Sequence, residues 1–183
     1  MKSDNQTFIA FLRGINVGGH HKVPMAELKT HLSNMGFENI ITILNSGNVI
    51  FDSAPKKEEK LEQEISVKLE TVFGFNIPVL IRNSDEILKI IDSNPFENHQ
   101  LTKDKRFYIS FLKKGKEVNL KTPWISDDNS FEILSADNKS ILSILDISVT
   151  GTPKAMGSLE KLYGKDITTR NWKTMLRIEK KLN

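Results

Sequence analysis

The segment that decides the fold is Thr7-Phe8-Ile9-Ala10-Phe11-Leu12-Arg13. Its apolar side chains alternate onto both faces of an extended chain, a pattern typical of a central strand that is covered on both sides. A later segment, Tyr108-Ile109-Ser110-Phe111-Leu112-Lys113, matches residues 8–13 with three identities and three similar pairs. This match indicates that the second half of the chain approximately repeats the architecture of the first half.

The hydrophobic spacing that follows the first strand predicts a βαββαβ unit over residues 7–82. Pro24 and the apolar residues spaced behind it predict a helix near residues 24–35, and a second helix is predicted near residues 56–73. The predicted strands are 39–44, 48–52 and 77–81, with the turn Asn45-Ser46-Gly47-Asn48 between the first two. This order of elements is the ferredoxin-like arrangement.

The second half is predicted to be a degenerate copy, because residues 115–126 contain a proline and define a first helix poorly. The other expected elements are strands over 130–134 and 140–147, a helix from Thr152-Pro153 to near Gly164, and a final helix over Thr169 to Leu182 in place of a long last strand. The expected fold class is therefore α+β, with two ferredoxin-like (βαββαβ-type) subdomains built of antiparallel or mixed sheets and helices. The expected divisions are a first subdomain over 1–83, a helix and connector over 84–104, and a degenerate second subdomain with a C-terminal helix over 105–183.

The composition excludes several classes of protein. The 183 residues include no cysteine, which excludes disulfides, thiol nucleophiles and cysteine-ligated metals. No apolar run approaches the roughly 18 residues that a membrane-spanning helix needs, and the first six residues are polar, unlike a signal peptide. We therefore expect a cytoplasmic protein with no membrane partner. The net charge of +3 does not by itself indicate nucleic-acid binding.

A candidate ligand site follows from the topology of the first unit. The first two strands of a split βαββαβ unit run in the same direction, so their carboxyl ends lie at one edge of the sheet. Residues 13–22 (RGINVGGHHK) therefore lie beside the turn 45–48 and the start of the first helix. Glycines allow close approach of a ligand, the helix start favours an anion, and Arg13 and Lys22 supply positive charge. The alternative is that the glycines only permit a tight turn and that the basic residues are solvated.

The predicted last helix carries a second basic feature. Its cationic residues at helical spacing are Arg170, Lys173, Arg177 and Lys180. Such a stripe is usually a solvated face, and Trp172 on the other side is expected in the core. Arg170 in a first helical turn opposes the helix dipole, so we expect it to have a partner, either Asp166 or a bound anion.

No metal site, cofactor or catalytic residue is assigned from the sequence. His20 and His21 are adjacent, and the other two histidines have no ligand-like spacing from them. The loop 13–22 matches neither the P-loop nor the dinucleotide fingerprint. Ser46 beside Gly47 resembles half of a nucleophile elbow, but it lies in a hairpin and not on a strand-to-helix turn.

Three motifs in the same order resemble one bacterial family. They are residues 11–19 (FLRGINVGG) followed by 22–25 (KVPM), residues 46–49 (SGNV) and residues 168–172 (TTRNW). The family is catalogued as a domain of unknown function, number sixteen ninety-seven in its series, and the similarity covers nearly the whole chain. The resemblance implies a small cytosolic α+β protein of two ferredoxin-like subdomains, and it implies no established activity, substrate or cofactor. This chain departs from the family at His20-His21, where members often have other polar or basic residues.

The leading hypothesis is a cytosolic binding protein for a phosphorylated or otherwise anionic small ligand. The ligand-binding candidates are Arg13, Gly14, Asn16, Gly18, Gly19, Lys22, Ser46, Gly47, Asn48, Arg170, Asn171 and Trp172. The alternative is a transferase or hydrolase acting on such a ligand at the same site, with Arg13 and Arg170 stabilising charge and a histidine of the loop as acid or base. RNA binding is the least favoured hypothesis, because the predicted strand 48–52 lacks the basic and aromatic pattern of RNA-recognition proteins. The oligomeric state is left open.

Overall fold

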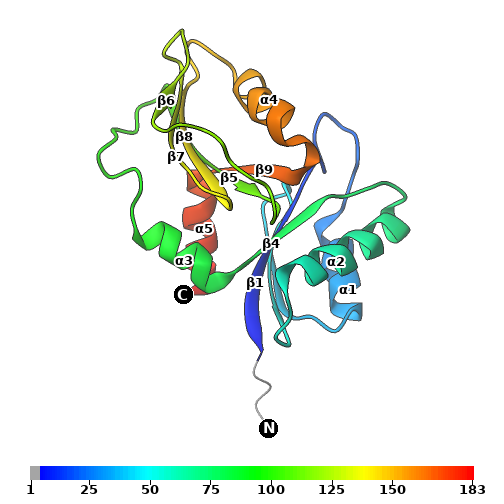
Figure 1. Ribbon diagram of the computed structural model, residues 1–183. Helices are drawn as coiled ribbons and strands as arrows, with labels where there is room; N and C mark the ends of the chain where they lie inside the picture. The colour runs from blue at the N-terminus through cyan, green and yellow to red at the C-terminus, as the bar shows by residue number, and fades with distance from the viewer. Residues whose placement is uncertain (1–4) are drawn as a thin grey trace. The chain divides into compact units, whose positions relative to one another are not determined.

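The computed structural model describes residues 5–183, and the chain divides into two compact units. The first unit extends to Lys89 and includes Leu182, and the second comprises Ile90–Lys181 and Asn183. Each unit is built on one antiparallel sheet with helices, which confirms the α+β class (Figure 1). Within residues 5–183, no helix combines the length and the apolar character that crossing a membrane requires.

The first unit has the predicted βαββαβ order. Its elements are β1 (Gln6–Leu12), α1 (Met25–Asn34), β2 (Glu38–Ile43), β3 (Asn48–Ser53), α2 (Glu58–Phe73) and β4 (Val79–Asn83), followed by α3 (Ser84–Asp92). The sheet order is β2-β3-β1-β4, and all neighbouring strands are antiparallel. Both predicted helices are confirmed to within about two residues at each end. In this half, the spacing of the apolar residues and the residues that begin and end the helices indicate the same boundaries.

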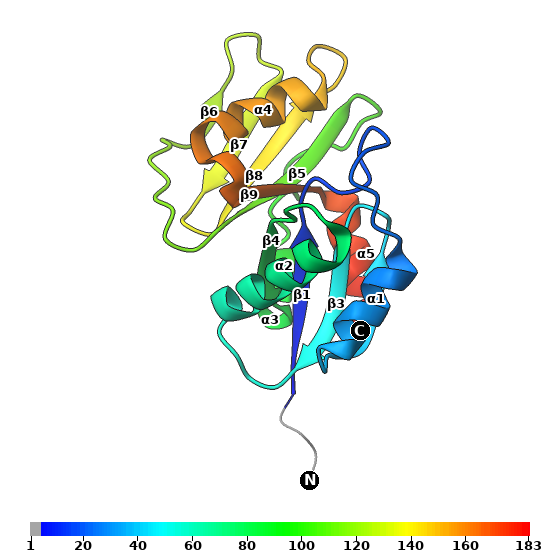
Figure 2. The ribbon, with the colours of Figure 1, turned by 90° about the vertical axis from the view of Figure 1, so that its right-hand side faces the viewer.

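Both faces of β1 are buried, as predicted. Phe8, Ala10 and Leu12 belong to the core that the sheet forms with α1 and α2, two helices that lie on the same side of the sheet (Figures 1 and 2). Ile9 and Phe11 point to the opposite face and are each 0% exposed. Because successive side chains point to opposite faces, the apolar residues of this one strand are buried on both sides of the sheet.

The second unit repeats this sheet with one change. Its elements are β5 (Lys105–Leu112), β6 (Trp124–Ile125), β7 (Phe131–Ala136), β8 (Ser140–Asp146), α4 (Thr152–Tyr163), the short 3-10 helix η1 (Gly164–Asp166), β9 (Ile167–Asn171) and α5 (Trp172–Leu182). The strands β7-β8-β5-β9 follow the same order as β2-β3-β1-β4. The two-residue strand β6, which the sequence did not predict, lies at the edge of the sheet in the part of the chain where the first unit has α1.

The predicted final helix over Thr169 to Leu182 is wrong at its beginning. Residues 167–171 form β9, which pairs antiparallel with β5, so this unit has a last strand after all. β-Branched residues at 167–169 favour the extended chain, and α5 begins at Trp172 because Asn171 caps it. Arg170 is therefore a strand residue, and the argument from the helix dipole does not apply to it.

The two units share a buried arginine that is followed by a capping asparagine. Arg82 of β4 and Arg170 of β9 occupy equivalent positions in the two sheets. Each Nη1 donates a hydrogen bond to the carbonyl of the preceding residue, at 2.7 Å and 2.9 Å respectively. Asn83 and Asn171 each accept, through Oδ1, the N–H of the residue two positions on at 2.9 Å. This Arg-Asn pair recurs after 88 residues in the sequence, a signal that the sequence analysis missed.

Replacing Asn171 tests the cap of α5. Asn171→Ala removes the acceptor for the Lys173 N–H, and we expect it to lower the free energy of unfolding by about 1 kcal/mol. Asn171→Asp keeps an acceptor and places a negative charge at the helix start, so it should retain wild-type stability. Urea unfolding followed by circular dichroism measures both variants. An equal loss in the two would show that the cap does not contribute.

Asp128 organises the turn between β6 and β7. Its Oδ1 accepts the Ser126 hydroxyl at 2.7 Å, the Ser130 hydroxyl at 2.6 Å and the Ser130 N–H at 3.0 Å. The Ser130 hydroxyl, followed by the Ser126 hydroxyl, holds the pKa of Asp128 well below its usual value of 3.8. The charged carboxylate is therefore favoured in the folded chain relative to the unfolded chain.

The pKa of Asp128 has a consequence for stability at low pH. Because its folded pKa lies below the unfolded value, its contribution is complete above the unfolded value of 3.8 and is lost as the pH falls towards the folded pKa. We expect wild type to exceed Asp128→Asn in melting temperature at pH 6, and the gap to narrow as the pH falls below about 3.8. Differential scanning calorimetry from pH 3 to pH 6 measures this gap. A gap that stays constant over that range would contradict the assignment.

Candidate functional site

The candidate site is one corner of the first unit, which comprises the glycine loop (residues 13–22), the β2–β3 turn (residues 44–47) and the start of α1. Because β1 and β2 are both antiparallel to β3, they run in the same direction and end at the same edge. The Leu12 N–H donates to the Gly47 carbonyl at 2.8 Å, and Asn16 Nδ2 donates to the Asn45 carbonyl at 2.8 Å. The glycine loop and the turn are therefore held together.

Asn16 fixes the glycine loop. Its Oδ1 accepts the Val23 N–H at 2.9 Å, and its Nδ2 donates to the Val23 carbonyl at 3.0 Å as well as to Asn45. Its φ of 56° lies in the left-handed region, which asparagine tolerates better than most residues. One side chain thus closes the loop on itself and fastens it to the turn, so the structure gives Asn16 a supporting role.

The glycine loop folds into a miniature hairpin. The His20 N–H donates to the Val17 carbonyl at 3.2 Å, and the Asn16 N–H donates to the His21 carbonyl at 3.0 Å. Gly18 and Gly19 form the tip with φ of 60° and 78°, and a Cβ added to either would meet no atom within 4 Å. These two glycines therefore provide left-handed backbone at an open tip, where a ligand can reach the main chain.

The two loop histidines differ in their surroundings. The His21 ring stacks on Phe75 with centroids 4.4 Å apart, and its Nδ1 lies 3.2 Å from the Gly14 carbonyl. His20 is exposed near the tip. Across residues 5–183, no group of three or more histidine, aspartate or glutamate side chains is arranged to hold a metal ion. The contact with Phe75 was not foreseen, because no local sequence pattern places the segment after α2 beside the glycine loop.

The β2–β3 turn is packed tightly against the loop. A Cβ on Gly47 would lie 2.7 Å from Leu12 Cβ and 2.9 Å from Ile15 Cδ1, and the φ of Gly47 is 77°. Asn48 is fully buried, and its Nδ2 donates to the Ile43 carbonyl at 2.9 Å and to Ser46 Oγ at 3.0 Å. Gly47 and Asn48 therefore build the corner, and Asn45 and Ser46 are the exposed polar residues of the turn.

The charged side chains of the glycine loop and the β2–β3 turn are of one sign. Arg13 follows β1, is half-buried, and its N–H donates to the Pro78 carbonyl at 2.9 Å. Lys22 is exposed and lies just before Pro24, the residue that precedes α1. The sequence has no aspartate or glutamate over 5–26 or 39–51, and the first carboxylate after the loop is Glu27. The glycine loop and the β2–β3 turn therefore combine two cations with no carboxylate, and Glu27 in the first turn of α1 is the carboxylate at the start of that helix.

The remaining candidates, Arg170, Asn171 and Trp172, belong to the second unit. Arg170 is 8% exposed; its Nη1 donates to Thr168 Oγ1 at 2.8 Å and to the Thr169 carbonyl, and burial lowers its pKa to about 10. Asn171 caps α5, and Trp172 packs edge-on against Phe96 with centroids 5.0 Å apart. The third motif thus has a clear structural function within its own unit.

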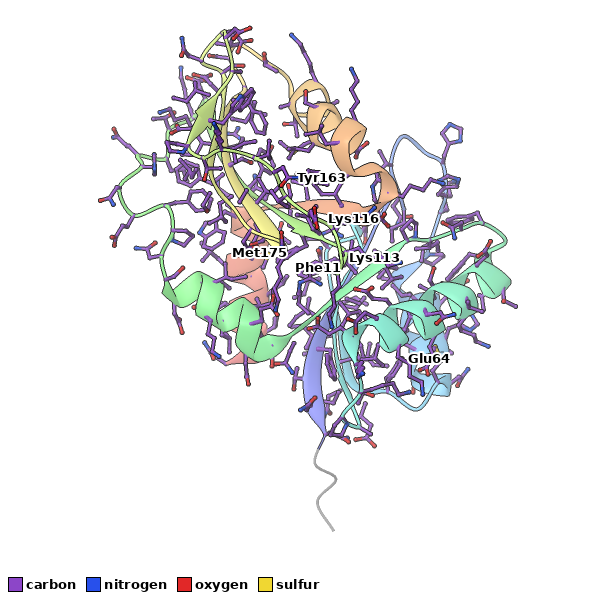
Figure 3. All side chains as sticks on the ribbon, viewed as in Figure 1. Phe11, Glu64, Lys113, Lys116, Tyr163 and Met175 are labelled. Atoms are coloured by element: carbon purple, nitrogen blue, oxygen red, sulfur yellow. The ribbon has the colours of Figure 1, made fainter. Side chains whose placement is uncertain are left out.

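Asp166, the other partner expected for Arg170, forms an ion pair with a lysine. Its Oδ2 lies 2.7 Å from Nζ of Lys116, which is labelled in Figure 3. Its backbone carbonyl accepts the Lys113 N–H at 2.8 Å, the equivalent of the bond between Arg13 and Pro78 in the first unit. The end of β5 is therefore anchored in the same way as the end of β1.

Fold and corner together define a protein of two ferredoxin-like α+β units with a glycine loop at the end of its first strand. The chain belongs to the family described as "Protein of unknown function (DUF1697)", which matches residues 6–137 and is the family that the sequence motifs indicated. It is similar in structure to the conserved bacterial protein SP0830 from Streptococcus pneumoniae, with a TM-score of 0.72 and 25% identity over 98% of this chain and 99% of that chain. No curated protein matches the chain.

Two glycine substitutions distinguish the cost of a steric clash from the cost of a left-handed backbone conformation. Both Gly47→Ala and Gly18→Ala impose a left-handed φ on alanine, which costs about 1–2 kcal/mol. Gly47→Ala also drives a Cβ into Leu12 Cβ, and overpacking adds about 1–3 kcal/mol. We therefore expect the larger loss of unfolding free energy from Gly47→Ala, measured by urea unfolding. Equal losses would contradict the close approach of the turn to Leu12.

Proposed function

We propose that the chain binds a phosphorylated or otherwise anionic small molecule at the corner of the first unit. The observation that carries this proposal is the pairing of Arg13 and Lys22 with exposed main chain in a loop and a turn that contain no carboxylate. Positive side chains beside backbone N–H groups are the combination with which proteins select an anion from water.

The start of α1 adds to the attraction. It has no side-chain cap, so its first N–H groups remain available to an anion. A helix N-terminus contributes on the order of 0.3 to 1 kcal/mol to an exposed negative charge, so Arg13 and Lys22 must supply most of the affinity. Asn16 holds loop and turn in place before a ligand arrives, which lowers the ordering cost of binding.

The buried second face of the sheet favours a small ligand over RNA. RNA-recognition proteins of this topology stack bases on aromatic residues of an open sheet face. In this chain the face opposite α1 and α2 carries Ile9, Phe11 and Ile50, which are at most 3% exposed.

Calorimetry on matched variants tests the site. Pyrophosphate and a panel of sugar phosphates are titrated into wild type, Arg13→Ala, Lys22→Ala and Lys60→Ala, the last replacing an exposed lysine of α2. Loss of a charged hydrogen bond costs about 1.5–3 kcal/mol, so Arg13→Ala should bind about ten- to hundredfold more weakly. Lys60→Ala should match wild type.

Equal affinities of Arg13→Ala and Lys60→Ala for every compound would reject the corner as the site. Product analysis after each titration tests the alternative of an enzyme, because a transferase or hydrolase would alter the compound that it binds.

A further inference from the structure

We infer that α5 carries a second binding surface, a cationic stripe that holds the phosphate backbone of a double-stranded nucleic acid. The stripe consists of Lys173, Arg177, Lys180 and Lys181, all of which are exposed. It differs from the stripe expected from the sequence, because Arg170 lies in β9 and Lys181 joins instead. The stripe shares no residue with the corner of the first unit, and neither proposal depends on the other.

The spacing makes the four cations neighbours. Residues three, four and seven positions apart lie on the same face of an α-helix, and Lys173, Arg177, Lys180 and Lys181 are related by these steps. Within residues 5–183, none of the four takes part in an ion pair. The only carboxylate on α5, Glu179, is half-buried and lies to the side of the stripe.

A helix elsewhere in the chain shows what a solvated face looks like. α2 mixes both signs along its length, with the sequence EEKLEQEISVKLETVF over Glu58–Phe73. By contrast, the exposed face of α5 repeats one sign at steps of four residues, so that neighbouring cations repel one another. A polyanion laid along the stripe removes that repulsion, whereas water only screens it.

The shape of the stripe favours a linear polyanion over a small anion. From residue 173 to residue 181 the helix rises about 12 Å, and a nucleic-acid strand carries one charge per roughly 3.4 Å of duplex axis. Three or four phosphates therefore match the stripe, roughly one for each cation. A small anion on the same convex face would contact one or two side chains in open water.

Burial of the opposite face favours nucleic acid over a membrane. Trp172, Met175 and Ile178 form the apolar side of α5 and are at most 9% exposed. An amphipathic helix that binds lipid inserts this side between headgroups, and in α5 it is already occupied within the protein. Attraction through the charged side alone is the mode of non-specific nucleic-acid binding.

Fluorescence anisotropy with a labelled 20-base-pair DNA duplex at 20 to 200 mM KCl tests the stripe. The stripe variant carries Lys173→Gln, Arg177→Gln, Lys180→Gln and Lys181→Gln. The control variant carries Lys57→Gln, Lys60→Gln, Lys89→Gln and Lys154→Gln, the same change of net charge at exposed positions elsewhere. We expect wild type and control to bind with a Kd of about 10⁻⁴ to 10⁻⁶ M at physiological salt and more tightly at 20 mM KCl, with log K falling against log salt with a slope of about −3.

The stripe variant should bind at least tenfold more weakly than the control, and Lys180→Gln alone should reduce the slope by about 1. Circular dichroism confirms that each variant is folded. Equal binding of stripe variant and control, or no binding of wild type at 20 mM KCl, overturns the proposal. Binding lost in Arg13→Ala but kept in the stripe variant would place the duplex at the corner and also overturns it. Stripe-dependent binding to phosphatidylserine vesicles without duplex binding would identify a membrane as the partner and would likewise overturn it.

Discussion

The structure of the first unit depends on β1, whose apolar side chains must be buried on both faces of the strand. β1 bonds to β3 on one side and to β4 on the other, so its backbone groups are satisfied within the sheet. Its side chains leave Phe8 and Ile9 on opposite faces, both almost fully buried. A strand of this kind cannot lie at an edge, and the crossing helices α1 and α2 follow from the need to cover one of its faces.

The sequence predicted the first unit well because the signals there are local and agree with one another. Apolar residues at helical spacing and the glycines that end the helices placed α1 and α2, and the direction of the strands placed the glycine loop beside the turn. The helices and strands of the second unit were harder to predict from the sequence. Thr169 and Arg170 extend the helical spacing of α5 backwards by coincidence, and pairing with β5 decides their extended conformation. A two-residue strand such as β6 has no period to detect.

In the candidate site, too, some features follow from the local sequence and others depend on tertiary packing. Topology and charge pointed to Arg13 and Lys22, whereas the tasks of Asn16, Asn48 and His21 depend on which residues tertiary packing brings beside them. Motif positions in this chain thus serve two purposes. Some, such as Gly47 and Asn171, are required by backbone geometry or helix capping, whereas Lys22 is exposed and charged with no such demand. Functional tests belong on residues of the second kind.

The second unit has β6 where the first unit has α1, and this difference bears on how many ligand molecules one chain can bind. The second unit anchors the end of β5 as the first unit anchors the end of β1, yet it has no helix after that strand and no equivalent of the glycine loop. A repeated fold therefore does not give a repeated binding site. The anion site that we propose at the glycine loop and the helix start therefore occurs once in each chain, which corresponds to a stoichiometry of one ligand per chain.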